Sequence, residues 1–222
     1  VGQTKLAWWS EELHGLSLGR ARHPVSQALL ACAHGELLHR AFPALLDAFD
    51  KAVQTGGFAT ISDLEAFADA TGGQLGEFEA ELNGHGGIEL ATARTIGGGL
   101  ELFQALRASP QKPLQQAWML PGDLLTSHGV EESDLNQEVT PRRLRKALAD
   151  YASSLLPKLT PKPGTTGDMP PSLESRAEMA RRALVAMRRA DYRLTERRIG
   201  ISPLRKLWIA WHVVWNLGHT AR

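Results

Sequence analysis

The chain has 222 residues, of which 43% are hydrophobic and 22% are charged, and this is enough apolar sequence for one domain with a full core. With 25 basic and 24 acidic side chains, its net charge of +1 gives no basic excess of the kind that nucleic-acid-binding proteins carry, so we expect no nucleic-acid partner. The one cysteine, Cys32, excludes an internal disulfide framework and favours a reducing, cytoplasmic compartment. No apolar run is long enough to span a bilayer.

Helices are predicted along nearly the whole chain, because leucine and alanine dominate and no stretch shows sustained alternation of apolar and polar residues. Capping signals mark three expected helix starts: a capping box at Ser62–Glu65, and a cap residue followed by proline at Thr140–Pro141 and at Ser202–Pro203. The expected helices cover residues 4–14, 24–39, 43–54, 62–83, 88–107, 140–156, 172–194 and 203–217.

Two proline-rich segments interrupt the helical pattern, at Ala108–Pro121 and at Leu156–Pro171. The second is rich in proline, glycine and threonine and shows no apolar periodicity, so we expect a mobile connection over about 157–171 that buries little. The residues after it are too few to bury a core alone. The sequence therefore predicts a single domain over residues 1–222.

Two glycine clusters fall inside expected helices, Gly72, Gly73 and Gly76 in one and Gly97–Gly99 in the other. A glycine inside a helix costs roughly 1 kcal/mol relative to alanine, so such clusters need a reason. Close contact between two helices, a kink, and a wall where a ligand approaches all remain open. Glu77 and Glu81, one helical turn apart, could share a metal ion, but a solvated helix face is the favoured interpretation.

The first glycine cluster lies in a motif, FADATGGQLGEF (Phe67–Phe78), that resembles the Y-C-x-x-V-A-G-x-V-G helix of the squalene and phytoene synthase family. Further on, GGGLELFQALRASPQKPLQQAWMLPGDLLTSHGV (Gly97–Val130) resembles, without gaps, the family segment that holds its second aspartate motif. LAWWSEEL, RHPVSQAL and ADYRLTERRIGISPLRKL resemble other family segments in the same order. The resemblance implies an all-α, isoprenoid-synthase-like helical bundle around a central cavity.

The resemblance also implies which residues line that cavity, and several differ from the family pattern. The two metal-binding aspartates correspond to Ala108 and Lys112, and the first aspartate motif would precede Trp8, upstream of Val1. The positions that the resemblance places at the cavity are Phe67, Gly73, Gly76, Glu101, Gln104, Arg107, Ala108, Lys112, Ala117 and Met119.

The exchange of two aspartates for Ala108 and Lys112 works against a metal site. Mg²⁺ binds through carboxylates and substrate phosphates, and the family uses it to offset the charge on a diphosphate leaving group. The exchange shifts the local formal charge by about +3. A like charge at ~4 Å opposes a cation by about 4 kcal/mol at an effective dielectric of ~20. We therefore expect no catalytic residue, no metal and no cofactor at this position.

Three functions follow from these differences. The favoured one is a noncatalytic scaffold that binds an unidentified protein partner. The second is an active, Mg²⁺-dependent prenyltransferase that condenses prenyl diphosphates in isoprenoid biosynthesis. The third is a protein that binds a prenyl lipid or diphosphate without turnover, with Arg107 and Lys112 contacting the phosphate. An apolar cavity beside Lys112 would favour the third.

Three of the six tryptophans, Trp208, Trp211 and Trp215, are spaced to lie on one face of the last helix. Burial in the core, contact with a membrane interface, and docking of a partner protein all remain open for this tryptophan stripe. The nearby Arg205, Lys206 and Arg222 would suit peripheral contact of a cytoplasmic protein with a membrane.

Overall fold

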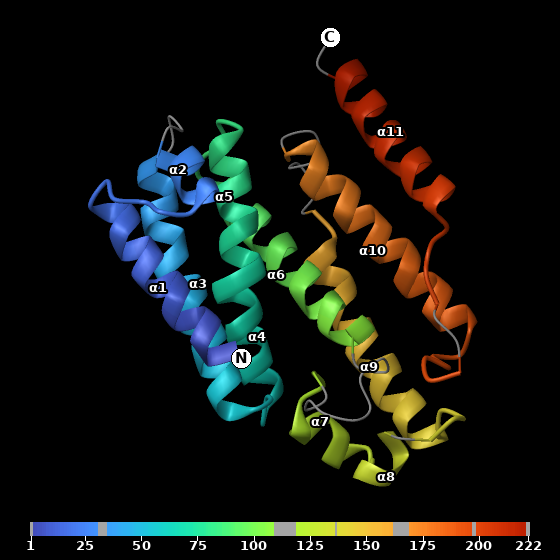
Figure 1. Cartoon of the computed structure of the whole chain (residues 1–222). Helices are drawn as coiled ribbons and strands as arrows, with labels where there is room; N and C mark the ends of the chain where they lie inside the picture. Colours follow the sequence, from blue (N-terminus) through green and yellow to red (C-terminus); the bar gives the residue numbers. More distant parts are fainter. Residues whose placement is uncertain are drawn as a thin grey trace. The chain divides into compact units, whose positions relative to one another are not determined.

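The computed structural model describes residues 2–30, 35–108, 119–135, 137–161, 169–196 and 199–220 (Figure 1). Within these ranges it contains helices and turns but no strand, which confirms the predicted all-α fold. The chain divides into two compact units, unit 1 (Val1–Gly56) and unit 2 (Gly57–Arg222).

Unit 1 consists of α1 (Gly2–Ser17), α2 (Pro24–Leu30) and α3 (Gly35–Thr55). α1 packs along α3, and α2 contacts both. The prediction of a break before Pro43 is wrong, because α3 runs through this proline. Packing of the buried Leu45 and Ala48 offsets the backbone hydrogen bond that the proline removes. Cys32 lies outside the described residues, so its environment stays a prediction.

A buried carboxylate, Glu12, holds the segment between α1 and α2. Its Oε1 atom accepts hydrogen bonds from the backbone N–H groups of Arg22, at 2.8 Å, and of His23, at 2.7 Å. These bonds favour the ionised form, and the one from His23 contributes most to lowering the pKa of Glu12 below its usual value. Glu12 therefore ties the two residues that precede α2 to α1.

We expect unit 1 to lose stability in acid through Glu12. Because its pKa is lowered on folding, the stabilisation is present above the ordinary carboxyl pKa and is lost as the pH falls through the lower folded value. Glu12→Gln should lower the melting temperature at pH 7, and the difference from the wild type should shrink at pH 4 and below. Glu11→Gln is the matched control, because Glu11 is exposed. A deficit of Glu12→Gln that does not change with pH would contradict this role.

Unit 2 is built around one central helix. Its elements are α4 (Ile61–Ala68), the π-helical turn η1 (Asp69–Gly73), α5 (Gln74–Leu82), α6 (Ile88–Ala108), α7 (Gly122–Ser127), α8 (Glu132–Leu135), α9 (Arg142–Leu159), α10 (Pro171–Arg189) and α11 (Pro203–Thr220). α6 packs against α4, η1, α5, α9 and α10, and α11 packs on α10 (Figure 1). Fully buried leucines such as Leu102, Leu106, Leu148 and Leu155 fill the core along α6 and α9.

Two predicted caps differ from the structure. α4 begins at Ile61, and its capping box joins Thr60 to Asp63 rather than Ser62 to Glu65: the Thr60 hydroxyl accepts from the Asp63 backbone N–H at 3.1 Å, and the Asp63 carboxylate accepts from the Thr60 N–H at 2.9 Å. α9 begins without a side-chain cap, because the Thr140 hydroxyl bonds the Thr195 hydroxyl at 2.7 Å instead. The predicted capping box and the predicted Thr140 cap are therefore both wrong, whereas α11 starts at Pro203 as predicted.

The predicted connection over 157–171 is shorter than expected. α9 includes Pro157 and ends at Leu159, and both Leu159 and Met169 are buried. Residues 162–168 lie outside the described residues, so the mobility of this connection stays a prediction. α10 ends at Arg189 rather than near residue 194, because Asp191 and Tyr192 adopt left-handed backbone conformations with φ of 51°.

Candidate functional site

The glycine clusters bring two helices of unit 2 into backbone contact. A Cβ atom at Gly97 of α6 would lie 2.1 Å from the carbonyl oxygen of Gly72, and one at Gly76 would lie 2.5 Å from the carbonyl oxygen of Ala93. Glycine alone allows this approach. Close helix contact, one of the predicted alternatives, is therefore what the structure has, and the π-helical turn at Asp69–Gly73 adds a local distortion beside it.

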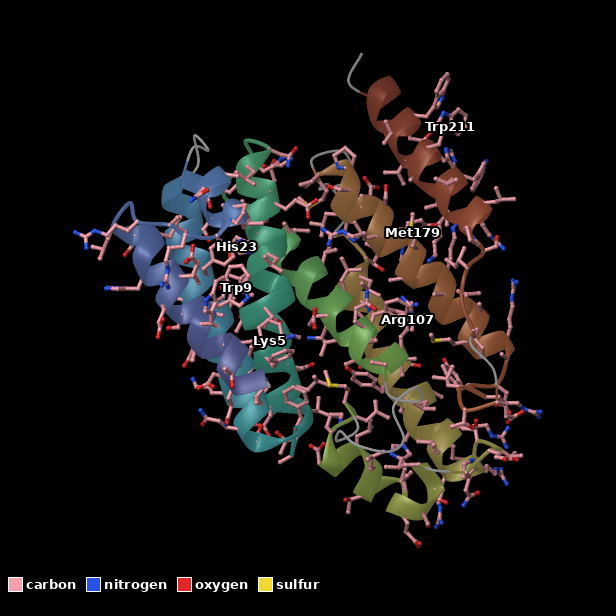
Figure 2. The ribbon with its side chains drawn as sticks, viewed as in Figure 1. Lys5, Trp9, His23, Arg107, Met179 and Trp211 are labelled. Carbon is pink, nitrogen blue, oxygen red and sulfur yellow. The ribbon has the colours of Figure 1, made fainter. Side chains whose placement is uncertain are left out.

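Beside this contact unit 2 has a cavity of about 760 Å³, a size typical of small-molecule sites. Its walls come from η1, α5, α6, α10, the start of α11 and the segment that leads into α11. Arg107 on α6 and Met179 on α10 are two of its lining residues (Figure 2). The apolar part of the lining is formed by Leu75, Leu100, Phe103, Leu173, Met179, Ala180, Ala183, Ile199, Ile201 and Pro203.

The ionisable groups at the cavity are mostly basic. Arg107, Arg176 and Lys206 line it, together with one carboxylate, Glu101. Arg176 forms an ion pair with Glu79, whereas Arg107 and Lys206 have no carboxylate partner among the described residues. The Arg107 guanidinium lies 3.5 Å from the Gln104 side-chain oxygen and 5.7 Å from the Phe103 ring centre. Two unpaired cations therefore border the cavity.

Glu101 projects from α6 into the same cavity, and it is half-buried. Burial raises its pKa above the usual carboxyl value, because the charged form loses hydration there. One such carboxylate cannot assemble the oxygen-rich shell that Mg²⁺ requires. Within the described ranges, no group of three histidine, cysteine, aspartate or glutamate residues is placed to hold a metal ion.

The structure brings together four of the ten residues predicted to line a cavity, namely Gly76, Glu101, Gln104 and Arg107. The others lie elsewhere or outside the described residues. Phe67 packs against Phe58 in the core, with ring centres 5.2 Å apart, and a Cβ at Gly73 would face the backbone of Arg94.

Four predicted positions remain. One is the last residue of α6, and the other three follow this helix in the sequence. Ala108 ends α6 and is half-buried there. Met119 is also half-buried, ahead of α7. Lys112 and Ala117 lie outside the described residues, so their predicted place at the cavity stays a prediction.

Of the acidic pair Glu77 and Glu81, which the sequence offers as a possible shared metal site, Glu77 takes part in an ion-pair network. Arg94 donates to Glu77 at 2.6 Å and to both carboxylate oxygens of Asp69, at 2.8 and 2.7 Å. These bonds raise the pKa of Arg94, chiefly through Asp69. The guanidinium thus occupies the position beside Glu77 where a cation would bind, and it joins η1, α5 and α6.

The last part of the segment Gly97–Val130, which resembles the family's second aspartate motif, has a structural role. The backbone N–H groups of Gly122 and Asp123 donate to the carbonyls of Phe58 and Ala59, both at 3.0 Å. The Asp123 carboxylate in turn accepts from the Ile61 N–H at 3.1 Å. This aspartate therefore fastens α7 to the start of α4 and does not line the cavity.

The sequence did not indicate the lining residues that come from α10 and α11, among them Arg176, Met179 and Lys206. One signal was available, since Ala177, Ala180 and Ala183 recur every third residue and mark a face where another helix or a ligand can approach. Nothing local indicated that this face of α10 would oppose Glu101 and Arg107 of α6.

Known proteins support the resemblance and extend it to nearly the whole chain. A sequence model of the family described as squalene/phytoene synthase matches residues 1–205. Among curated protein sequences, none matches this chain.

Solved structures share the fold. A dehydrosqualene synthase in complex with ligand is similar with a TM-score of 0.83 and 19% identity, over 98% of this chain and 79% of that one. The squalene synthase HpnC from Alicyclobacillus acidocaldarius has a TM-score of 0.68 and 18% identity, over 86% of this chain and 74% of that one. YisP from Bacillus subtilis subsp. subtilis strain 168 has a TM-score of 0.55 and 15% identity, over 95% of this chain and 93% of that one. At these identities the structures show the fold alone, whereas the family match covers most of the chain: this protein belongs to the squalene/phytoene synthase family.

Proposed function

We propose that this chain is a noncatalytic member of its family that binds an anionic prenyl lipid in the unit 2 cavity without a divalent metal. The observation that carries the proposal is the charge of the cavity lining, where Arg107, Arg176 and Lys206 accompany the single carboxylate Glu101. A lining of this kind attracts an anion directly. It thereby differs from the aspartate-lined sites that attract Mg²⁺ first.

Mg²⁺, which the family implies, does not fit the residues present. The position of one expected ligand is held by Ala108, which has no oxygen beyond its backbone, and Glu101 is too isolated to replace a pair of aspartates.

The apolar wall supports a hydrocarbon ligand rather than a small anion. Leu100 and Phe103 on α6 and Met179 and Ala183 on α10 all line the cavity. The methionine side chain is flexible and adapts to irregular apolar ligands. Arg107 lies one turn beyond Phe103, so a ligand with its chain against Phe103 would carry its phosphate towards Arg107.

The test is calorimetric titration of farnesyl diphosphate into the protein in the presence of EDTA. We expect binding without metal, and weaker binding of farnesol, which lacks the phosphates. Arg107→Gln combined with Lys206→Gln should raise the Kd about tenfold or more, because charge-assisted hydrogen bonds to the phosphate are lost.

Arg142→Gln is the matched control, since Arg142 is exposed on α9 and does not line the cavity. Binding that requires Mg²⁺ would instead favour the prenyltransferase function. No binding of either ligand, with a folded protein, would leave the scaffold function as the remaining hypothesis.

A further inference from the structure

The last helix, α11, shows its apolar face to solvent. Ile209 is buried against the rest of unit 2, and α11 packs on α10. At 100° per residue, the opposite side of the helix is apolar along its length. Its exposed residues are Leu204, Leu207, Trp208, Trp211, Val214 and Trp215.

The tryptophan stripe belongs to this outward face. Trp208, Trp211 and Trp215 are 49%, 58% and 51% exposed, so burial in the core, one of the three interpretations of the stripe, does not describe it. Figure 2 shows Trp211 on the side of α11 away from α10. Trp211 and Trp215 lie against each other with ring centres 5.3 Å apart. An amphipathic helix normally buries such a face, so this one needs a nonaqueous surface to cover it.

Charge around α11 indicates what kind of surface that is. Residues 171–222 contain eleven basic and four acidic side chains, a formal charge of +7, whereas residues 1–170 contain fourteen basic and twenty acidic ones, a charge of −6. Next to α11 a hollow is lined by Arg182, Arg189 and Arg205, with no carboxylate in its lining. The Arg182 guanidinium lies 5.4 Å from the Trp208 ring centre and also binds Glu178.

We propose that α11 docks this protein on a membrane surface rich in anionic phospholipids. Tryptophan prefers the boundary between headgroups and acyl chains, and basic residues beside it are attracted to anionic lipid. Arg189 and Arg205 have no carboxylate partner among the described residues and can reach lipid phosphate. No described helix meets the length and hydropathy needed to cross a bilayer.

The same helix borders the cavity, which gives the docking a consequence. Pro203 and Lys206, in the first turn of α11, line the cavity together with Ile201 and Ser202 just before it. A docked α11 therefore holds this side of the cavity at the bilayer, where a prenyl lipid would enter. This last step rests on the proposed function, whereas the docking itself does not.

The test is flotation of the purified chain, without prenyl ligand, with vesicles of phosphatidylcholine alone or with added phosphatidylserine. We expect binding to the anionic vesicles, with a blue shift of tryptophan emission, and little binding to the neutral ones. Trp211→Ala combined with Trp215→Ala should weaken partitioning about tenfold or more. Arg189→Gln combined with Arg205→Gln should weaken it only on anionic vesicles, by about fivefold per charge.

Trp8→Ala is the matched control, because Trp8 is an exposed tryptophan of α1 in unit 1. Arg107→Gln should bind vesicles like the wild type, which separates failure of the docking from failure of the cavity proposal. Absence of vesicle binding at low salt overturns the docking. So does a concentration-dependent dimer that the double tryptophan variant abolishes, since a second copy would then cover this face.

Discussion

Gly97→Ala is expected to destabilise unit 2 by more than about 3 kcal/mol, a large part of the 5–15 kcal/mol that stabilises a typical domain. The new Cβ would lie 2.1 Å from the carbonyl oxygen of Gly72, 3.0 Å from its carbonyl carbon and 3.1 Å from the Cα of Gly76. All three atoms are backbone, so no side chain can rotate away. Relief would require α6 to separate from η1 and α5.

Gly98→Ala, one residue on, is the matched control. Its Cβ would have its nearest neighbour, the carbonyl oxygen of Ala68, at 3.6 Å, an ordinary contact. Alanine also favours the helix over glycine by roughly 1 kcal/mol, so this variant should be neutral or slightly stabilised. Urea unfolding followed by circular dichroism compares the two. Equal unfolding midpoints for both variants would show that α5 and α6 do not approach as closely as described.

The glycine contact matters for the site as well as for the fold. Gly72, Gly76 and Gly97 all line the cavity, so the region where the two backbones meet is also part of its wall. Larger residues there would push α5 away from α6 and change the shape of the wall that bears Glu101 and Gln104. A substitution at this contact that still allows unit 2 to fold should therefore change its affinity for a prenyl lipid.

Local patterns in the sequence predicted the helices better than their ends. The rod formed by α4, η1 and α5 covers residues 61–82, close to the predicted 62–83, because apolar periodicity extends across many residues. Its cap was misplaced by two residues, because Thr60 and Ser62 are both competent cap residues and tertiary contacts decide between them. The sequence predicts that the helix ends before Pro157, yet buried Leu155 and Leu159 on either side of this proline hold the last turn of α9 in the helix.

The cavity could be predicted on one side only. Glu101, Gln104 and Arg107 repeat at helical spacing along one segment, so a gapless match places them together. Arg176 and Lys206 reach the same cavity from residues far along the chain, and that approach depends on how α10 and α11 pack, which no local pattern encodes. The exposure of the tryptophan stripe has the same origin, since spacing identifies a face but not what covers it.

The purified chain is expected not to condense farnesyl or geranylgeranyl diphosphate. The reaction needs metal ions to offset the charge that develops on the diphosphate leaving group. Glu101 is the one acidic residue in the described lining of the cavity, and Ala108, at the end of α6, offers no side-chain ligand atom. In the sequence, Lys112 adds a positive charge four residues further on. Arg107 and Lys206 can hold the phosphate, but they do not replace a metal cluster.

The measurement is incubation with prenyl diphosphate, Mg²⁺ or Mn²⁺, and NADPH, followed by extraction and mass detection of C30 and C40 hydrocarbons. We expect no product above a heat-killed control. Ala108→Asp combined with Lys112→Asp returns two carboxylates to the family spacing, and it lowers the local charge by about three units. This variant should gain Mg²⁺-dependent affinity for farnesyl diphosphate, because the metal then has ligands from the two new aspartates and from the phosphates. Metal-dependent product from the wild-type chain would contradict the noncatalytic function. This would hold even if the wild-type chain binds farnesyl diphosphate in the presence of EDTA.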